Sequence, residues 1–388
     1  MSGTAVRVGD FAIDVEAATL GDLRARLSRT RWPSGLAGTG WERGTDVKEL
    51  RELCAYWADG FDWRAQEKSL NALRQVVVDV GGLATHAVHV RSPEPDAVPL
   101  LLTHGWPGTF AEFRNVVAPL ADPASHGGDP RAAFHVVCPS LPGYGFSAAP
   151  REPGWDIRRV GRHLADLMSA LGYDRFAAQG GDWGAMATQF MALDVPERLI
   201  GIHLNLVLAY PPGTPDAMEG LTESELARAQ RFTALNAAGG INYALVQGMT
   251  PHTLSPGLSD SPAGLASWIM EKFHAWTQNT GRVADAVSWD DLLTHLTLYW
   301  VTNTIGSSIE LYLESTRAGT MAPPPARVEV PTGGALFPYD MLAPARKWAE
   351  PYFNIVRWTE FDGGGHFPAM ERPREFVEDV RAFFAPLR

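Results

Sequence analysis

The sequence predicts an α/β fold: a doubly wound, mostly parallel sheet with a helical cap inserted into it and an N-terminal arm domain. Three observations predict it. Short apolar runs alternate with helical periodicities over residues 76–205, as in strands joined by crossover helices. Over residues 211–322 helical periodicity dominates, and strand signals return from residue 328. Residues 1–95 differ from both parts, because they are mainly helical and contain four tryptophans.

The composition is that of a soluble globular protein with a sizeable core. Of the 388 residues, 45% are hydrophobic and 20% are charged. The net charge of −11 argues against nucleic acid or an anionic membrane as a partner. The two cysteines, Cys54 and Cys138, form no CxxC motif, so we expect reduced thiols, no disulfide framework and no bound metal.

The N-terminal segment and the apolar runs give no signal for export or membrane insertion. Residues 1–16 lack the basic and apolar regions of a signal peptide, and no apolar run reaches the ~18 residues of a membrane span. We therefore expect a cytoplasmic protein that does not bind membranes.

Residues 1–95 are predicted to form the arm and the first strands. Four tryptophans need a partner surface, which indicates packing on the main body: Trp32, Trp41, Trp57 and Trp63. The glycines at 81 and 82 join two alternating apolar runs and predict a hairpin. The expected elements are strands 11–16, 76–80 and 85–90 and helices 20–28, 47–59 and 66–73.

The remaining chain divides into two parts of one sheet, separated by the cap. Residues 96–210 are predicted to hold strands 99–103, 134–138, 176–178 and 199–205, with helices from 111, over 157–172 and from 185. Residues 211–322 are the expected cap, with helices 226–235, 263–277 and 290–312. Residues 323–388 complete the sheet with strands 328–331 and 355–361 and a closing amphipathic helix over 375–384.

A candidate nucleophile lies between the strand at 176–178 and the helix that follows. Gly180, Gly181 and Gly184 surround Asp182, and small residues at these positions are typical of the nucleophile elbow of α/β-hydrolases, where the central residue has a strained backbone. A carboxylate nucleophile forms an alkyl-enzyme ester. The alternative is a surface Gly-Gly-Asp turn without catalytic function.

An elbow nucleophile requires an acid and then a histidine further along the chain. Asp340 follows the strand at 328–331, and His366 follows the next strand after three glycines that free the loop to orient the imidazole. His252, His274 and His295 lie within the helical pattern of the cap, where we expect them to be packed or solvated.

The segment His104-Gly-Trp-Pro107 is predicted to supply an oxyanion hole. Trp106 keeps its backbone N–H, which Pro107 helps to aim, and the second donor is the N–H of Trp183. One such donor contributes about 3 kcal/mol to transition-state stabilisation. The alternative is a buried turn with a packed tryptophan.

At these residues the chain resembles the epoxide hydrolases of the microsomal type. The resemblance covers nearly the whole chain and rests on His104-Gly-Trp-Pro-Gly108, Gly180-Gly-Asp-Trp-Gly184, residues 260–273, Gly364-Gly-His-Phe367 and the arm motifs Thr30-Arg-Trp-Pro33, Tyr56-Trp57 and Phe61-Asp-Trp-Arg64. The membrane-anchoring helix of microsomal members is not matched, so the likeness is to a soluble bacterial relative. Asp340 stands where some relatives have Glu, and either carboxylate orients an imidazole.

The resemblance implies an α/β-hydrolase fold and an epoxide hydrolase that acts on a small epoxide and water without a cofactor. It implies that Tyr243 and Tyr312 hydrogen-bond the epoxide oxygen, whereas Tyr299 is expected to be core. Trp106, Trp183 and the two tyrosines are thus expected to bind substrate. A phenol suits this role because it stays protonated until charge develops on the oxygen.

Two other functions and several details stay open. A haloalkane dehalogenase also uses an elbow aspartate, but its halide needs no proton donor; a hydrolase-fold binding module would lack part of the triad. The aromatic residues of the cap indicate an apolar epoxide, such as an aryl or vinyl one: Phe232, Trp268, Phe273 and Trp276. The oligomeric state, a homodimer included, and the role in secondary metabolism or detoxification are not determined by the sequence.

Overall fold

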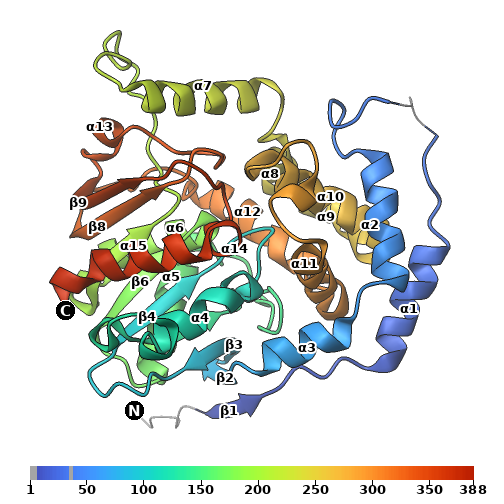
Figure 1. The fold of residues 1–388 in the computed structure, drawn as a ribbon, viewed down its shortest axis with the longest axis horizontal. Helices are drawn as coiled ribbons and strands as arrows, with labels where there is room; N and C mark the ends of the chain where they lie inside the picture. Colours follow the sequence, from blue (N-terminus) through green and yellow to red (C-terminus); the bar gives the residue numbers. More distant parts are fainter. Residues whose placement is uncertain (1–6, 35–37) are drawn as a thin grey trace.

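The computed structural model describes residues 7–34 and 38–388, so the first six residues of the predicted arm lie outside the described part. A nine-stranded sheet forms its centre, in the order β1-β2-β3-β5-β4-β6-β7-β8-β9 (Figure 1). The strands β4 to β9 run parallel to one another, whereas the pairs β1–β2, β2–β3 and β3–β5 are antiparallel. The strands are β1 (Val8–Phe11), β2 (Gln75–Val80), β3 (Leu83–Val90), β4 (Val98–Thr103), β5 (Phe134–Pro139), β6 (Phe176–Gly180), β7 (Leu199–Leu204), β8 (Val328–Leu336) and β9 (Phe353–Glu360).

Helices cover both faces of the sheet, which confirms the doubly wound architecture. α4 (Arg114–Ala121) packs against α15 (Pro373–Phe384), and α5 (Ile157–Ala170) packs against α6 (Asp182–Asp194). In Figure 1 the first pair lies in front of the sheet and the second pair behind it. Most residues of the inner strands β4 to β7 are buried, and β6 is buried along its whole length, as their continuous apolar runs predict.

Six further helices form a layer over one edge of the sheet, called the helical layer below. They are α7 (Glu223–Ala237), α8 (Asn242–Met249), α9 (Pro251–Asp260), α10 (Pro262–Trp276), α11 (Trp289–Thr302) and α12 (Ile305–Ala318). Among the described residues, no helix is both long enough and apolar enough to cross a membrane.

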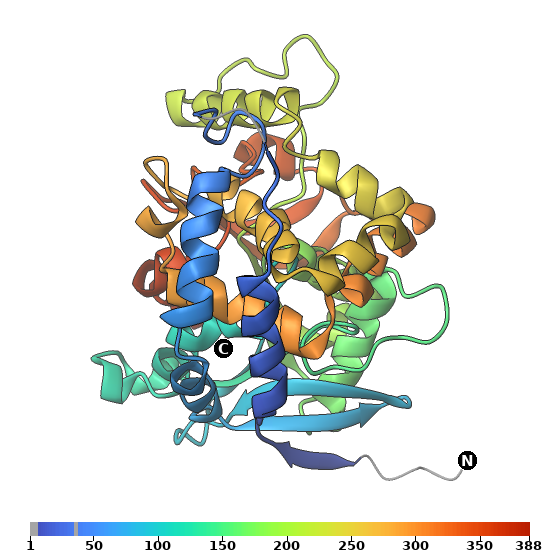
Figure 2. The same cartoon turned by 90° about the vertical axis from the view of Figure 1, so that its right-hand side faces the viewer.

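The arm helices lie along the side of the helical layer (Figure 2). α1 (Ala17–Ser28) and α2 (Val47–Asp59) pack against α10, and α3 (Trp63–Asn71) packs against α11. Trp57 and Trp63 are buried, while Trp41 stacks on His274 at a ring separation of 3.9 Å. Trp41 and Trp57 therefore pack on the helical layer, whereas Trp32 lies under Arg51 and Trp63 bonds Glu67 within the arm.

The expected element bounds need three corrections. The first strand spans 8–11 instead of 11–16, because its partner in the sheet is β2 over residues 75–78. The helix expected over 290–312 is two helices, since Asn303 between them has a left-handed backbone (φ 52°). α8 and α9 were not expected, because Gly248 and two prolines interrupt their periodicity.

Candidate active site

Asp182 lies at the sharp turn between β6 and α6, as the elbow pattern predicts. It is buried and has a left-handed backbone (φ 50°). A Cβ atom on Gly184 would lie 1.9 Å from the carbonyl oxygen of Thr103, so only glycine fits there. The Gly-Gly-Asp turn is thus enclosed by its neighbours and does not lie on the surface.

The structure brings Asp182, His366 and Asp340 together. His366 Nδ1 lies 2.7 Å from Asp340 Oδ1, and His366 Nε2 lies 3.3 Å from Asp182 Oδ2. All three side chains are buried. Asp340 follows β8 and His366 follows β9, so both loops leave the sheet at the edge where β6 delivers Asp182.

The two carboxylates determine the charge of the imidazole. Burial by itself would lower the pKa of His366, but the charges of Asp340 and Asp182 and the hydrogen bonds to them outweigh it and raise the pKa to about 10. The ring is therefore protonated near neutral pH; its Nδ1 donates a hydrogen bond to Asp340, and its Nε2 forms an ion pair with Asp182.

The backbone around Trp106 faces the same carboxylate. The Trp106 N–H donates to Asp182 Oδ1 at 2.8 Å. A Cβ on Gly105 would lie 2.1 Å from that oxygen, so glycine permits this approach. Burial lowers the pKa of His104 to about 4, and the neutral ring bonds the Gly105 carbonyl through Nδ1 and accepts the Leu141 N–H at Nε2.

The N–H of Trp183 is the second predicted donor. Trp183 is the second residue of α6, and the first-turn N–H groups of a helix have no partner within the helix. Its indole packs edge-on against Tyr312 with ring centres 4.6 Å apart. The residue therefore contacts both the elbow and the helical layer.

Tyr243 on α8 and Tyr312 on α12 line the same cavity as Asp182. Their rings meet at 74° with centres 5.8 Å apart, and both hydroxyl-bearing side chains are buried. Burial is the main cause that raises the pKa of each phenol well above its usual value. Tyr299 does not join them: its hydroxyl donates to the Gly108 carbonyl at 3.0 Å.

The cavity that contains these groups has a volume of about 360 Å³. Trp106 is not part of its wall, because its indole is fully buried and stacks on Tyr243 at 5.3 Å. Among the four cap aromatics singled out in the sequence, only Phe232 lines it. The wall is mainly apolar and is formed by Asp182, Trp183, Met186, Leu206, Leu208, Tyr210, Phe232, Asn236, Ile241, Tyr243, Ala244, Leu245, Gly248, Met249, Tyr312, Thr316, Met321, Met341 and Leu342.

The end of α10 is fastened to the loop that presents His366. The His366 N–H donates to the Trp276 carbonyl at 2.8 Å. Glu371 in α14 (Pro368–Glu371) accepts the N–H groups of Gln278 and Phe367 at 3.0 and 3.1 Å. A Cβ on Gly365 would lie 2.2 Å from the Trp276 carbonyl oxygen. Glycine before His366 thus allows the backbone of the loop to approach the end of α10 closely. This is a more specific role than the loop flexibility that we expected from the sequence.

Sequence reasoning missed a further carboxyl group near the triad, besides Asp182 and Asp340. Glu112 lies in the short 3-10 helix η1 (Phe110–Phe113), and burial raises its pKa to about 8 although the charge of His366 opposes the shift. A single acidic residue in an otherwise apolar helical turn gives no sequence signal. The histidines set aside earlier lie elsewhere: His295 bonds Thr109, His274 stacks on Trp41 and His252 pairs with Glu310.

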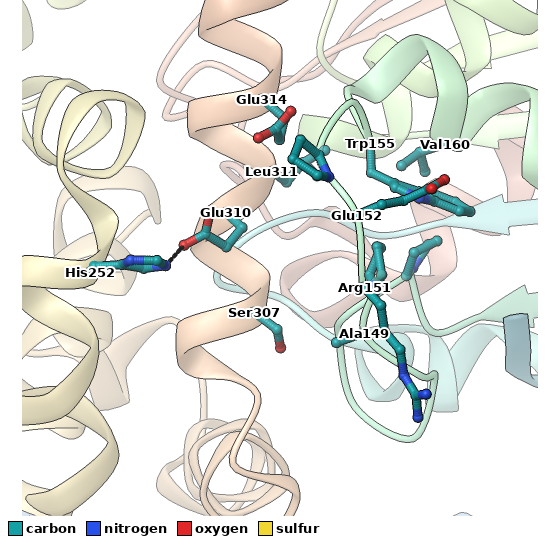
Figure 3. A pocket seen from close by; sticks show the side chains of 13 residues that line it. Ala149, Arg151, Glu152, Trp155, Val160, His252, Ser307, Glu310, Leu311 and Glu314 are labelled. Atoms are coloured by element: carbon teal, nitrogen blue, oxygen red, sulfur yellow. Dashed lines mark ion pairs between the residues drawn. The ribbon is translucent and has the colours of Figure 1, made fainter.

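A second hollow, of about 320 Å³, lies on another face of α12 (Figure 3). Glu310, Leu311 and Glu314 of α12 face Trp155 and the loop around Arg151, and His252 lies 2.7 Å from Glu310. None of the predicted catalytic residues lines it. The cavity at Asp182 is therefore the candidate site.

Two family models match the chain. Residues 8–113 match "Epoxide hydrolase N terminus", and residues 98–373 match "alpha/beta hydrolase fold". Epoxide hydrolase 1 of Sus scrofa is 35% identical over 404 residues, which cover 97% of this chain and 88% of that protein.

Two solved structures share the fold over almost the whole chain. Juvenile hormone epoxide hydrolase of the silkworm Bombyx mori has a TM-score of 0.89 at 29% identity, covering 99% of this chain and 95% of its own. Epoxide hydrolase of Aspergillus niger has a TM-score of 0.89 at 28% identity, covering 100% and 98%.

Proposed function

Since the chain belongs to the epoxide hydrolase family and is itself an epoxide hydrolase, we propose that it opens an apolar epoxide through an ester on Asp182. The strongest support is the way in which the Asp182 carboxylate is held, with one oxygen bonded and the other available. Oδ1 is held by the Trp106 N–H at 2.8 Å, which leaves Oδ2 to attack. Oδ2 lies beside His366 and its residue lines the same cavity as Tyr243 and Tyr312.

The first step forms one bond and breaks one. Asp182 Oδ2 attacks a ring carbon, the carbon–oxygen bond of the epoxide breaks, and the oxygen receives a proton from the hydroxyls of Tyr243 and Tyr312. The oxygen leaves with a negative charge, so it needs a donor as it departs. Solvent then returns the proton to the phenol.

The second step releases the diol. His366, oriented by Asp340, takes a proton from water, and the resulting hydroxide attacks the Asp182 carbonyl carbon. The oxyanion forms at Oδ1, where the N–H groups of Trp106 and Trp183 stabilise it. The ester bond then breaks, the departing oxygen takes the proton held by His366, and a vicinal diol leaves. The Asp182 carboxyl group returns its proton to the imidazole, which restores the starting state. We assign helices 211–322 to a cap that supplies the two phenols.

The wall of the cavity supports an apolar substrate. Leucine, methionine and isoleucine account for nine of its 19 lining residues, and aromatic side chains add to its apolar surface. Leu245 and Met249 extend to the surface, where they are 58% and 69% exposed. Two phenol donors in the wall fit an epoxide better than a haloalkane, since a halide leaves without a proton. Epoxides of this kind arise in secondary metabolism and are removed by detoxification. The two cysteines, both free and buried, suit a cytoplasmic location.

The ester is tested with the His366→Gln variant. The ring still opens in this variant, but no base activates water, so the protein should become heavier by one whole epoxide, with the adduct on Asp182. Asp182→Asn should form no adduct, and His274→Gln, whose ring stacks on Trp41 away from the site, should turn over normally. In a wild-type single turnover in labelled water, the label should enter Asp182. Label in the first diol would show direct attack by water and would refute the ester.

A further inference from the structure

Lys272 of α10 is a buried ammonium group that the mechanism above does not use. Its residue is only 4% exposed, and its one ion-pair partner among the described residues is the neighbouring Glu271. Lysine is almost never buried this far unless its charge is compensated, because removing an ammonium from water is costly. Compensation here must come from groups besides a single carboxylate.

Three aromatic rings lie close to its ammonium group. The Lys272 Nζ lies 4.4 Å from the ring centre of Tyr243, 5.8 Å from that of Trp276 and 5.9 Å from that of Trp268. A cation within about 6 Å of an aromatic ring centre is attracted by the ring's negative face. Tyr243 is the nearest of the three rings, and it alone lines the cavity with Asp182.

We propose that Lys272 is a positioning residue that acts through Tyr243 and stabilises its ring while the epoxide opens. This inference rests on the proposed function. As the carbon–oxygen bond breaks, the Tyr243 O–H shifts its proton toward the epoxide oxygen, and negative charge develops on the phenol oxygen and its ring. The attraction between ring and ammonium is then stronger than in the ground state, so it accelerates the step.

The electrostatics around Tyr243 explain why such a cation is needed. Burial and the negative charge of Asp182 raise the pKa of Tyr243 well above its usual value, which makes the phenol a weak donor. Glu271 acts in the same direction, but it is more exposed than Lys272. Lys272 is the positive charge that lies over the ring itself.

The first experiment compares the two chemical steps. Lys272→Met should slow the single-turnover alkylation of Asp182 about tenfold, whereas hydrolysis of the ester that forms should keep its wild-type rate. Lys272→Arg, which keeps the charge over the ring, should restore alkylation to within about threefold. Lys68→Met, at an exposed lysine of α3, is the matched control and should change neither step.

The second experiment isolates the pair. In a Tyr243→Phe background, Lys272→Met should cause no further loss of alkylation; in a Tyr312→Phe background, the tenfold loss should persist. If Lys272→Met does not fold, the same double-mutant comparison is made with Lys272→Gln. Alkylation at the wild-type rate in Lys272→Met, or an equal loss in both backgrounds, would overturn the role of Lys272. A missing Asp182 adduct in His366→Gln would instead refute the ester mechanism.

Discussion

At the scale of single residues, the charge of His366 depends on the chemical state of Asp182. In the free enzyme the Asp182 and Asp340 carboxylates raise the pKa of His366 to about 10, so the ring is protonated near neutral pH. In the mechanism we propose, ester formation converts Asp182 to a neutral group and removes one of these charges. The pKa of His366 then falls, and the ring becomes able to take a proton from water in the step that needs a base.

Replacing Asp182 by Asn should therefore lower the pKa of His366, as followed by nitrogen NMR of the imidazole. The raised pKa also makes the free energy of unfolding depend on pH. Because the folded pKa exceeds the unfolded value of ~6.5, the His366 contribution is fully present below that pH and is lost as pH rises toward 10. This loss should be smaller in Asp182→Asn. Asp59→Asn, at an exposed position, is the control, and the same pKa in both variants would contradict the argument.

Loss of either cavity phenol should slow ring opening much more than it weakens substrate binding. Tyr243→Phe or Tyr312→Phe should slow alkylation about 10²-fold each, because each removes a hydrogen bond that strengthens as charge develops on the oxygen. Tyr299→Phe should alkylate almost normally, since its hydroxyl bonds the Gly108 carbonyl. Pre-steady-state alkylation rates provide the measurement. If Tyr299→Phe slowed alkylation and Tyr312→Phe did not, Tyr299 and not Tyr312 would be the second proton donor.

At the scale of elements, the sheet was predictable and the helical layer only in part. Strands β4 to β7 are buried on both faces, and such strands appear in the sequence as continuous apolar runs. α8 and α9 are short and contain glycine and proline, so their packing against α12 stabilises them more than their own periodicity does. The break between α11 and α12 depends on the left-handed backbone of Asn303, which the pattern of apolar residues does not indicate.

The site residues also differ in how far the sequence alone predicts them. Asp182, Asp340 and His366 each follow a strand, so their convergence at one edge follows from the order of the elements. The tyrosines required the resemblance to a family, because a helical tyrosine has the same pattern in a core as in a site. The position of Lys272 over Tyr243 arises from the packing of α10 on α8 and could not be read from either helix alone.

The contacts between α10 and the His366 loop should matter for the second chemical step. Glu371→Ala removes the acceptor of the Gln278 and Phe367 N–H groups, so the loop should lose its fixed position. We expect ester hydrolysis to slow by about 10²-fold, as a displacement near 1 Å can cost, while alkylation stays near normal. Glu378→Ala in α15 is the matched control. Equal slowing of both steps would show general damage to the fold.

At the scale of the whole molecule, the arm joins the helical layer to the sheet. β1 is an edge strand of the sheet and pairs with β2, while residues of α2 form hydrogen bonds to α11 and to Val283, which precedes it. Glu49 accepts the Val283 N–H at 3.0 Å, Tyr56 donates to Asp290 at 2.8 Å and Trp57 donates to Thr297 at 2.9 Å. The buried apolar residues of arm, layer and sheet belong to one continuous core. The three parts should therefore unfold together.

Trp57→Ala tests this coupling. The indole is 2% exposed, so its removal leaves a cavity between α2 and α11 and an unpaired Thr297 hydroxyl, at a cost of ~3–5 kcal/mol in the free energy of unfolding. Because the core is continuous, calorimetry should show one transition at a lower temperature, and alkylation well below it should be unchanged. Trp32→Ala, which removes a half-buried ring under Arg51, should cost about 1 kcal/mol. A separate early transition in Trp57→Ala would show that the arm unfolds independently, and the arm would then not couple the helical layer to the sheet.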